Sequence, residues 1–216
     1  MDVMTAIVTR RSETILTEPA PNDEEFRYLL RGAATAPDHG RLRPWRWILV
    51  RGEARAALTR ALEPLPPQDP VASQLAPTTP PLDLSGFPAA EERPRSLPEP
   101  PLRALLVFAP SAGHGIPEWE QLAASCSMTH ALMMLLHARG YGSIWRTGEL
   151  CTSPGPRGLL HMAEGERLLG SLDIGTSPEG PRQRRPLPDI SDRVSVFETA
   201  TALRPTHGPR ESVGAE

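Results

Sequence analysis

The sequence predicts a fold that mixes helices and strands within one domain. Apolar residues recur at helical spacing in several segments, whereas the short apolar runs between these segments have the length of buried strands. The chain has 216 residues, which is enough for one domain with a substantial core. We therefore expect a single domain over residues 1–200, followed by a flexible tail over residues 201–216.

The first part of the chain predicts three helices and one strand. Apolar residues at helical spacing indicate a short helix over residues 4–11. Asn22 and the acidic residues after it are typical of a helix start, and Pro37 ends the helix that follows. The run Trp-Arg-Trp-Ile-Leu-Val at residues 45–50 predicts a strand, and residues 53–62 predict a third helix.

Residues 64–101 differ in composition from the rest of the chain. Twelve of the 26 prolines lie there, and neither helical nor alternating apolar spacing survives. We expect an extended loop with some polyproline II character. Because such a long connection is uncommon inside a compact domain, we interpret it as an insert or a lid.

The second part of the chain predicts three strands and the longest helix. Residues 104–109 and 168–174 have the composition of buried strands, and residues 192–197 predict a final strand. The helix covers residues 118–139 and is apolar around most of its circumference, so we expect burial on most faces, with Cys126 in the core. In a domain of this size, a second copy of the chain is the simplest cover for its remaining face.

Composition and charge exclude several classes of protein. The net charge of −3 favours neither nucleic acid nor an anionic membrane as a partner. All 23 basic residues are arginine, which excludes a lysine Schiff base or a lysine general base. No apolar run approaches the roughly 20 residues of a membrane span, and the start lacks a signal-peptide pattern, so we expect a cytoplasmic protein. The two cysteines form no disulfide framework, and no His or Cys spacing completes a metal site.

Two short segments in the first part of the chain are candidate ligand-binding elements. Arg10 and Arg11 offer guanidinium groups that bind phosphate bidentately, and Ser12 adds a hydroxyl. The same residues also fit the solvated basic end of a helix. His39 lies in a turn after Pro37, where a histidine serves as a ring contact, as a general acid or only as a surface residue; Asp38 is a candidate to orient it.

A third candidate segment covers residues 142–148, Gly-Ser-Ile-Trp-Arg-Thr-Gly. Glycines allow the backbone to approach a ligand closely. Trp145 offers a ring that stacks on a ligand or lines a pocket, and Arg146 a cation for a phosphate or a carbonyl oxygen. The alternative is an edge strand with a tryptophan in the core.

The order of these segments along the chain is specific. A first helix ends in R-R-S, then comes A-P-D-H-x-x-x-x-P-W-x-W, and W-E-Q (Trp119 to Gln121) opens the long helix. That helix runs into G-Y-G-x-I-W-R-T-G, and a later strand ends in I-G-T. This pattern resembles the nitroreductase superfamily, in particular its small (short-chain) FMN-dependent NAD(P)H nitroreductase subgroup. The resemblance covers residues 1–62 and 103–176 well and residues 177–200 loosely.

The resemblance implies an α+β fold with a mainly antiparallel central sheet flanked by helices. It also implies an intertwined homodimer that binds two FMN molecules at the subunit interface, with a C-terminal segment reaching across to the partner. The implied activity is hydride transfer from NAD(P)H by way of FMN to an electron-poor small molecule, such as a nitro compound or a quinone. Because the flavin performs the hard step, no side chain is assigned as a catalytic residue.

The resemblance also implies which residues contact the cofactors. The phosphate and ribityl groups of FMN would be held by Arg10, Arg11 and Ser12, and the same flavin would be contacted from the other subunit by Thr35 and His39. The flavin site would be closed by Trp145, Arg146 and Thr147. The nicotinamide nucleotide would meet the end of the long helix, at Leu135, Leu136, His137, Ala138, Arg139 and Gly140.

Three features depart from the family pattern. Residues 64–101 replace a helix, Thr35 stands where some relatives have Arg, and Arg43 stands where many have Gln. Two alternatives therefore stay open beside the nitroreductase activity. One is a flavin-dependent tailoring dehydrogenase or oxidase of a small metabolite, and the other is a non-enzymatic flavin-binding or interaction protein.

Overall fold

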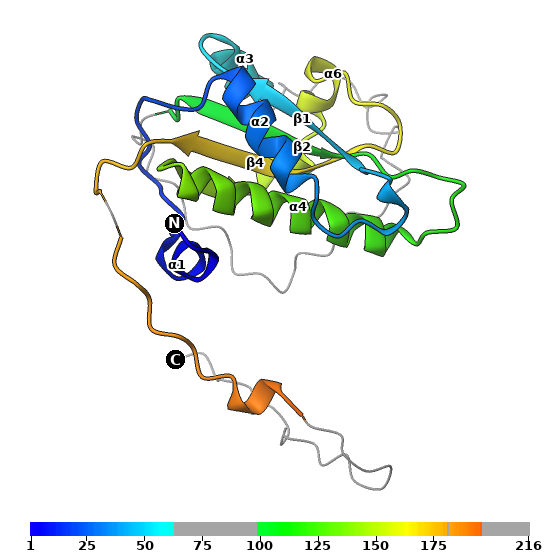
Figure 1. The fold of residues 1–216 in the computed structure, drawn as a ribbon. Coiled ribbons are helices and arrows are strands. Elements are labelled where there is room, and N and C mark those ends of the chain that lie inside the picture. The colour runs from blue at the N-terminus through cyan, green and yellow to red at the C-terminus, as the bar shows by residue number, and fades with distance from the viewer. Residues whose placement is uncertain (63–98, 181, 196–216) are drawn as a thin grey trace, which may run out of the picture.

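A four-stranded antiparallel sheet forms the centre of the fold, with the strand order β1–β2–β4–β3 (Figure 1). The computed structural model describes residues 1–62, 99–180 and 182–195. The strands are β1 (Trp45–Val50), β2 (Leu102–Phe108), β3 (Gly142–Arg146) and β4 (Arg167–Gly175).

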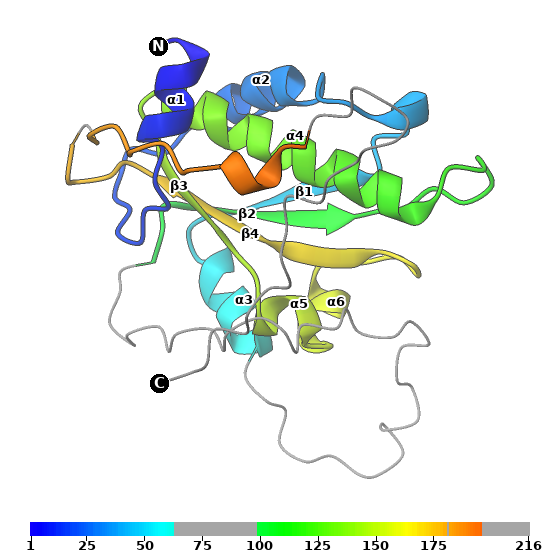
Figure 2. The same ribbon diagram turned by 90° about the horizontal axis from the view of Figure 1, so that it is seen from below.

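Helices cover both faces of this sheet (Figure 2). On one face lie α1 (Val3–Thr9), α2 (Asp23–Ala33) and α4 (Glu118–Ala138); on the other lie α3 (Ala54–Leu62), α5 (Glu149–Thr152) and α6 (Gly155–Leu159). Two 3₁₀ turns, η1 (His39–Arg41) and η3 (Ser191–Arg193), complete the elements of the described residues. The α+β fold with an antiparallel sheet between helices is confirmed.

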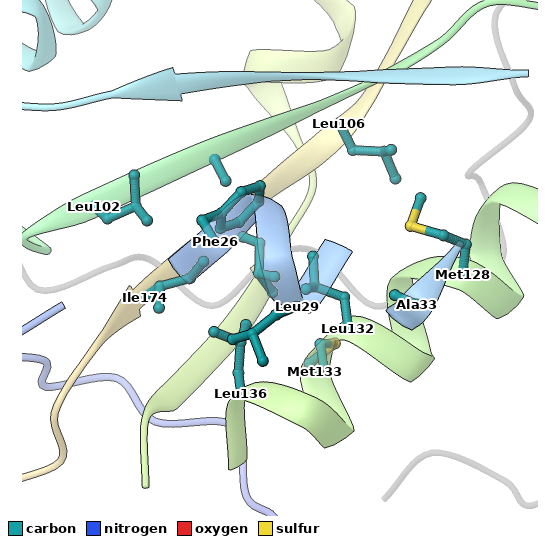
Figure 3. Packing of buried hydrophobic residues seen from close by; sticks show 12 residues of the cluster. Phe26, Leu29, Ala33, Leu102, Leu106, Met128, Leu132, Met133, Leu136 and Ile174 are labelled. Carbon is teal, nitrogen blue, oxygen red and sulfur yellow. The ribbon is translucent and has the colours of Figure 1, made fainter. Parts of the chain in front are cut away.

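The larger core lies between the sheet and helices α2 and α4 (Figure 3). Phe26 and Leu29 of α2 pack there, and β2 alternates, sending Leu106 into this core and Leu105 into a smaller one beneath α3. All seven residues of β2 are buried, since helices cover both faces of the strand. This explains why β2 appears in the sequence as a continuous apolar run.

Helix α2 begins and ends where its sequence predicts. The Asn22 side chain accepts a hydrogen bond of 2.8 Å from the backbone N–H of Glu25, which is the expected N-cap. Three acidic residues occupy the first turn, where they interact favourably with the helix dipole. The helix ends at Ala33, shortly before Pro37.

Two predictions from the sequence are wrong. Residues 191–193 form a 3₁₀ turn and residues 194–195 belong to no strand, so the part of the predicted strand 192–197 that is described is not a strand. Cys126 is exposed rather than in the core, because α4 buries only one side against the sheet and α2. Most of the proline-rich segment and all of the tail 201–216 fall outside the described residues.

The sequence also missed α5 and α6, two helices of four and five residues. Among the helices of the described residues, none combines the length and the apolar character that crossing a membrane requires.

Candidate active site

The chain after α1 lies along the free edge of β3. Ser12 forms an isolated parallel bridge with Ser143, and the Glu13 N–H donates a hydrogen bond of 3.2 Å to the Ser143 carbonyl oxygen. Further on, Thr17 and Thr176 exchange two backbone hydrogen bonds of 3.0 and 2.8 Å. These contacts fix the Arg-Arg-Ser segment against the sheet, with Ser12 exposed.

Arg10 carries a buried polar atom that lacks a partner. Its Nη1 is inaccessible to solvent, and no atom of the described residues accepts a hydrogen bond from it. Burial lowers the pKa of Arg10, and the charges of Arg185 and Arg11 lower it further, while Glu13 opposes them. A buried unpaired guanidinium nitrogen is costly unless an anion compensates it. The site therefore suits an anionic ligand.

The Arg11 side chain is hydrogen-bonded to backbone carbonyl oxygens. Its guanidinium donates to the carbonyl oxygens of Val8 and Arg10, both at 3.0 Å, and to that of Gln183 at 2.7 Å. These bonds tie the chain after β4 to helix α1. Arg11 thus adds positive charge beside Arg10 while its own donors hold the fold together.

Further arginines fasten the C-terminal segment to α1 and to the chain just after it. The buried Glu13 carboxylate accepts hydrogen bonds of 2.6 and 3.0 Å from Arg182, and this pairing lowers the pKa of Glu13. The backbone N–H of Arg185 donates a hydrogen bond of 2.9 Å to the Val8 carbonyl oxygen. As a result Arg185, which sequence reasoning missed, lies close enough to Arg10 for its charge to lower the pKa of Arg10. The density of arginines at 182–185 was the available signal.

His137 completes the cluster from the end of α4. Its Nε2 lies 2.8 Å from Thr9 Oγ1, and that hydroxyl donates a hydrogen bond of 2.6 Å to the Thr5 carbonyl oxygen. Because the hydroxyl proton is used there, we assign the proton of the His137 contact to Nε2. Burial lowers the pKa of His137, and the positive charge of Arg10 lowers it further.

The other residues of the segment 135–140 have different surroundings. Leu136 is fully buried in the main core, so its side chain offers no surface to a nucleotide. Leu135 packs toward Gly32 of α2, and Arg139 forms an ion pair of 3.0 Å with Glu25. Ala138, Arg139 and Gly140 are exposed.

Trp145 and Arg146 lie on opposite faces of β3. The Trp145 ring packs against the main core, and its Nε1 donates to the Leu169 carbonyl oxygen at 3.1 Å. Gly170 makes this packing possible, since a Cβ atom there would lie 2.6 Å from Trp145 Nε1 and its φ is +135°. Arg146 instead donates a hydrogen bond of 3.0 Å to the Asp173 carboxylate on the other face. Thr147, the next residue, is exposed.

Thr35 and His39 lie along a different part of α4. Thr35 lines an open groove of about 590 Å³ between the turn after α2 and the outer face of α4. The other lining residues are Ala36, Pro37, Cys126, Ser127, His130 and Ala131. His39 pairs with Glu120 at the start of the helix, at 2.6 Å. Asp38 does not orient His39, because its carboxylate accepts the backbone N–H groups of Leu42 and Arg43.

Within one chain, the Arg10 cluster and His39 are far apart. His137 and Glu120, their respective neighbours on α4, are separated by seventeen residues of helix. At 1.5 Å per residue, this corresponds to about 25 Å along the helix axis. One protomer therefore does not gather all predicted contacts around one ligand.

Comparison with known proteins identifies the class of this fold and site. The model of the Nitroreductase family matches residues 7–176. The chain belongs to the nitroreductase family and is an oxidoreductase of that family.

Individual relatives agree with this assignment. The chain is 31% identical over 199 residues to the Escherichia coli (strain K12) protein named "Putative NAD(P)H nitroreductase YdjA", covering 91% of this chain and 100% of that one. A crystal structure of a nitroreductase-like family protein from Bacillus cereus has a TM-score of 0.68 at 23% identity, covering 92% and 97% of the two chains. The FMN- and NADPH-dependent nitroreductase NfnB from sphigopyxis sp. strain HMH has a TM-score of 0.60 at 19% identity, covering 92% and 100%.

Proposed function

We propose that this protein is an FMN-dependent oxidoreductase that takes hydride from NAD(P)H and passes reducing equivalents to an electron-poor small molecule, such as a nitro compound or a quinone. When bound, FMN supplies the hydride-accepting and hydride-donating ring. The residues of the chain bind and orient the cofactor and the two substrates. The names of the Escherichia coli relative and of NfnB support this choice of cofactor and reductant.

The buried, unpaired Nη1 of Arg10 is the observation that carries this proposal. A phosphate monoester supplies the anionic oxygens that this nitrogen lacks, and charge-assisted bonds of this kind are strong. Arg11 and Arg185 add positive charge beside it, and Ser12 adds an exposed hydroxyl one residue beyond Arg11. The cluster fits the phosphate end of FMN, which anchors the rest of the cofactor.

We also propose that two copies of the chain build each flavin site. His39 lies too far from the Arg10 cluster to reach the same ligand within one chain, but a partner packed along α4 brings the partner's own Thr35 and His39 to that ligand. The outer face of α4 is available for this packing, with Ala123, Cys126 and His130 exposed. A single protomer leaves apolar side chains uncovered on the C-terminal segment as well, at Leu187, Ile190 and Val194.

The test is the absorbance spectrum of the purified protein, followed by anaerobic addition of NADH and NADPH. We expect a yellow protein with the visible bands of flavin, which bleach when the preferred nucleotide is added and return when a nitroaromatic or a quinone follows. A protein that takes up no FMN at micromolar concentration would overturn the proposal. Bound flavin that neither nucleotide reduces would leave a flavoprotein but refute the NAD(P)H-dependent activity.

A further inference from the structure

We propose that Glu120 is a positioning residue for His39. It holds the imidazole ring so that Nδ1 carries a proton and Nε2 is free for the flavin bound at the Arg10 cluster of a second copy of the chain. This inference rests on the proposed function, because it assigns His39 to a flavin site. The pairing itself, however, is a property of the chain without any ligand.

The geometry of the pair assigns the proton. His39 Nδ1 lies 2.6 Å from Glu120 Oε2, which is a short hydrogen bond. An ionised carboxylate only accepts, so the ring nitrogen is the donor and Nδ1 carries the hydrogen. The Glu120 side chain is 27% exposed and that of His39 is 68% exposed. The carboxylate is thus partly sheltered while the ring presents its other edge outward.

The loop that carries His39 is held rigidly. Gly40, Arg41 and Arg43 have positive φ angles of 72°, 52° and 47°, a conformation that persists only where surrounding contacts enforce it. The Asp38 carboxylate supplies such contacts by accepting from the N–H groups of Leu42 and Arg43, at 3.3 and 2.8 Å.

A neighbouring loop supports this turn from the side. Ile116 packs against Gly40 so closely that a Cβ atom at Gly40 would lie 2.5 Å from the Ile116 side chain. Gln121, which follows Glu120, bonds this loop through its side-chain amide, to both backbone groups of Ser111 and to the Ile116 carbonyl oxygen. Adjacent residues of the W-E-Q motif therefore hold the His39 ring and the loop behind it.

A fixed ring matters for binding because it removes the wrong tautomer before the ligand arrives. With Nδ1 protonated, the neutral ring offers Nε2 as a hydrogen-bond acceptor, and the protonated ring offers it as a donor. A histidine without Glu120 would divide its population between tautomers and rotamers, and ordering it would weaken ligand binding. Partners that orient metal-binding histidines change affinity or activity about 10- to 100-fold, and for His39 we expect the lower end of that range.

The first test reads the tautomer directly in the protein without flavin. Nitrogen-15 NMR of labelled histidine distinguishes a protonated Nδ1 from a protonated Nε2. We expect the Nδ1–H form of His39 in the parent protein and in Glu120→Gln, whose side-chain oxygen still accepts. Glu120→Leu should lose it. The matched control is Glu118→Gln, which removes a negative charge from the same helix turn. Glu118 pairs with Arg167 rather than with His39.

The second test measures FMN affinity by fluorescence quenching in a double-mutant cycle. We expect Glu120→Leu and His39→Ala each to weaken binding about tenfold, and the double variant to be no weaker than His39→Ala alone. Glu120→Gln should restore binding to within about twofold of the parent, as Glu118→Gln should. Additive losses, or an Nε2–H tautomer in the parent, would overturn the inference. A parent protein that binds no FMN would instead refute the proposed function.

Discussion

Arg10 illustrates how one residue links the fold to the proposed cofactor. Its backbone caps α1, and its side chain is held in a partly buried place where Nη1 meets no acceptor among the described residues. Sequence reasoning selected Arg10, Arg11 and Ser12 together, but the structure separates their roles. Arg11 holds carbonyl oxygens, whereas Arg10 keeps donor capacity for a ligand.

Replacing Arg10 should weaken FMN binding selectively. We predict that Arg10→Ala loses about 2–3 kcal/mol of binding free energy, or roughly 30-fold to 150-fold in Kd, because it removes charge-assisted bonds to phosphate. Equilibrium titration of the flavin-free protein with FMN measures this change. Arg27→Ala is the control, since Arg27 is exposed on α2. Equal losses in both variants would argue against a phosphate site at Arg10.

His137 should make the stability of the flavin-free protein depend on pH. Burial and the charge of Arg10 lower its pKa below the ordinary value of 6.5, so the folded protein keeps the ring neutral where the unfolded chain binds a proton. This contribution is therefore complete above pH 6.5 and is lost as the pH falls toward the lowered value.

Urea unfolding at pH 7.5 and 5.5, at one protein concentration, measures this effect. We predict that His137→Gln shows a smaller loss of unfolding free energy between the two pH values than the parent protein does. His114→Gln, at an exposed loop histidine, serves as the comparison and should retain the parent's dependence. An unchanged pH dependence in His137→Gln would show that the ring is not held neutral.

At the scale of elements, β2, β3 and β4 are joined by one buried carboxylate. Asp173 is 1% exposed and accepts from Arg103 at 2.8 Å and from Arg146 at 3.0 Å. Although burial lowers the pKa of Arg103, the Asp173 hydrogen bond and charge outweigh it and raise that pKa. This network orients Arg146, one of the residues predicted to close the flavin site, away from the core that holds Trp145.

Removing the Asp173 charge should be strongly destabilising. We predict that Asp173→Asn lowers the free energy of unfolding by about 3–5 kcal/mol, because two guanidiniums lose the charge of their shared carboxylate. Among the described residues, the buried Arg103 then keeps only its 3.5 Å ion pair with Glu99. Chemical denaturation followed by circular dichroism measures the change. The control Asp23→Asn breaks an exposed ion pair with Arg51 and should lower the free energy of unfolding by less than about 1 kcal/mol. A loss of that small size at Asp173 would contradict the role given to it.

The elements that the sequence predicted well are those with strong local patterns. Strand β1 and helices α2, α3 and α4 begin and end within a few residues of their predicted bounds, because caps and apolar spacing are local signals. Helices α5 and α6 are four and five residues long, which is too short for a cap or an apolar period to show in the sequence. Leu150 in α5 and Leu160 just after α6 pack on the smaller core, a contact that only the tertiary fold reveals.

The candidate site was predicted less completely than the fold. Local motifs selected His39 and Trp145, but the pairing of His39 with Glu120 joins residues 81 positions apart and needs the tertiary fold. The same holds for Arg185, which the path of the chain after β4 brings to Arg10. Cys126 was misplaced because an apolar helix does not reveal which of its faces packs against the sheet and α2.

At the scale of the whole molecule, two surfaces of the chain fit the two-chain assembly that we propose. In Figure 1 the chain after β4 leaves the body beside α1 and carries η3 away from the sheet. Arg182, Arg184 and Arg185 fasten the first part of this segment to α1 and to Glu13 just after it. The described residues 187–195, with the outer face of α4, form the surface that we propose a second copy covers, bringing His39 of one chain to Arg10 of the other.

Combining two variants that each bind FMN weakly tests this shared site most directly. Arg10→Ala and His39→Ala should each bind FMN poorly as homodimers, because both of their sites lack one contact. A heterodimer of the two, purified with a different tag on each chain, contains one site with Arg10 and His39 both intact and one site with neither. We predict that it binds one FMN per dimer with the affinity of the parent protein. Binding no tighter than that of either homodimer would contradict a flavin site shared between two chains.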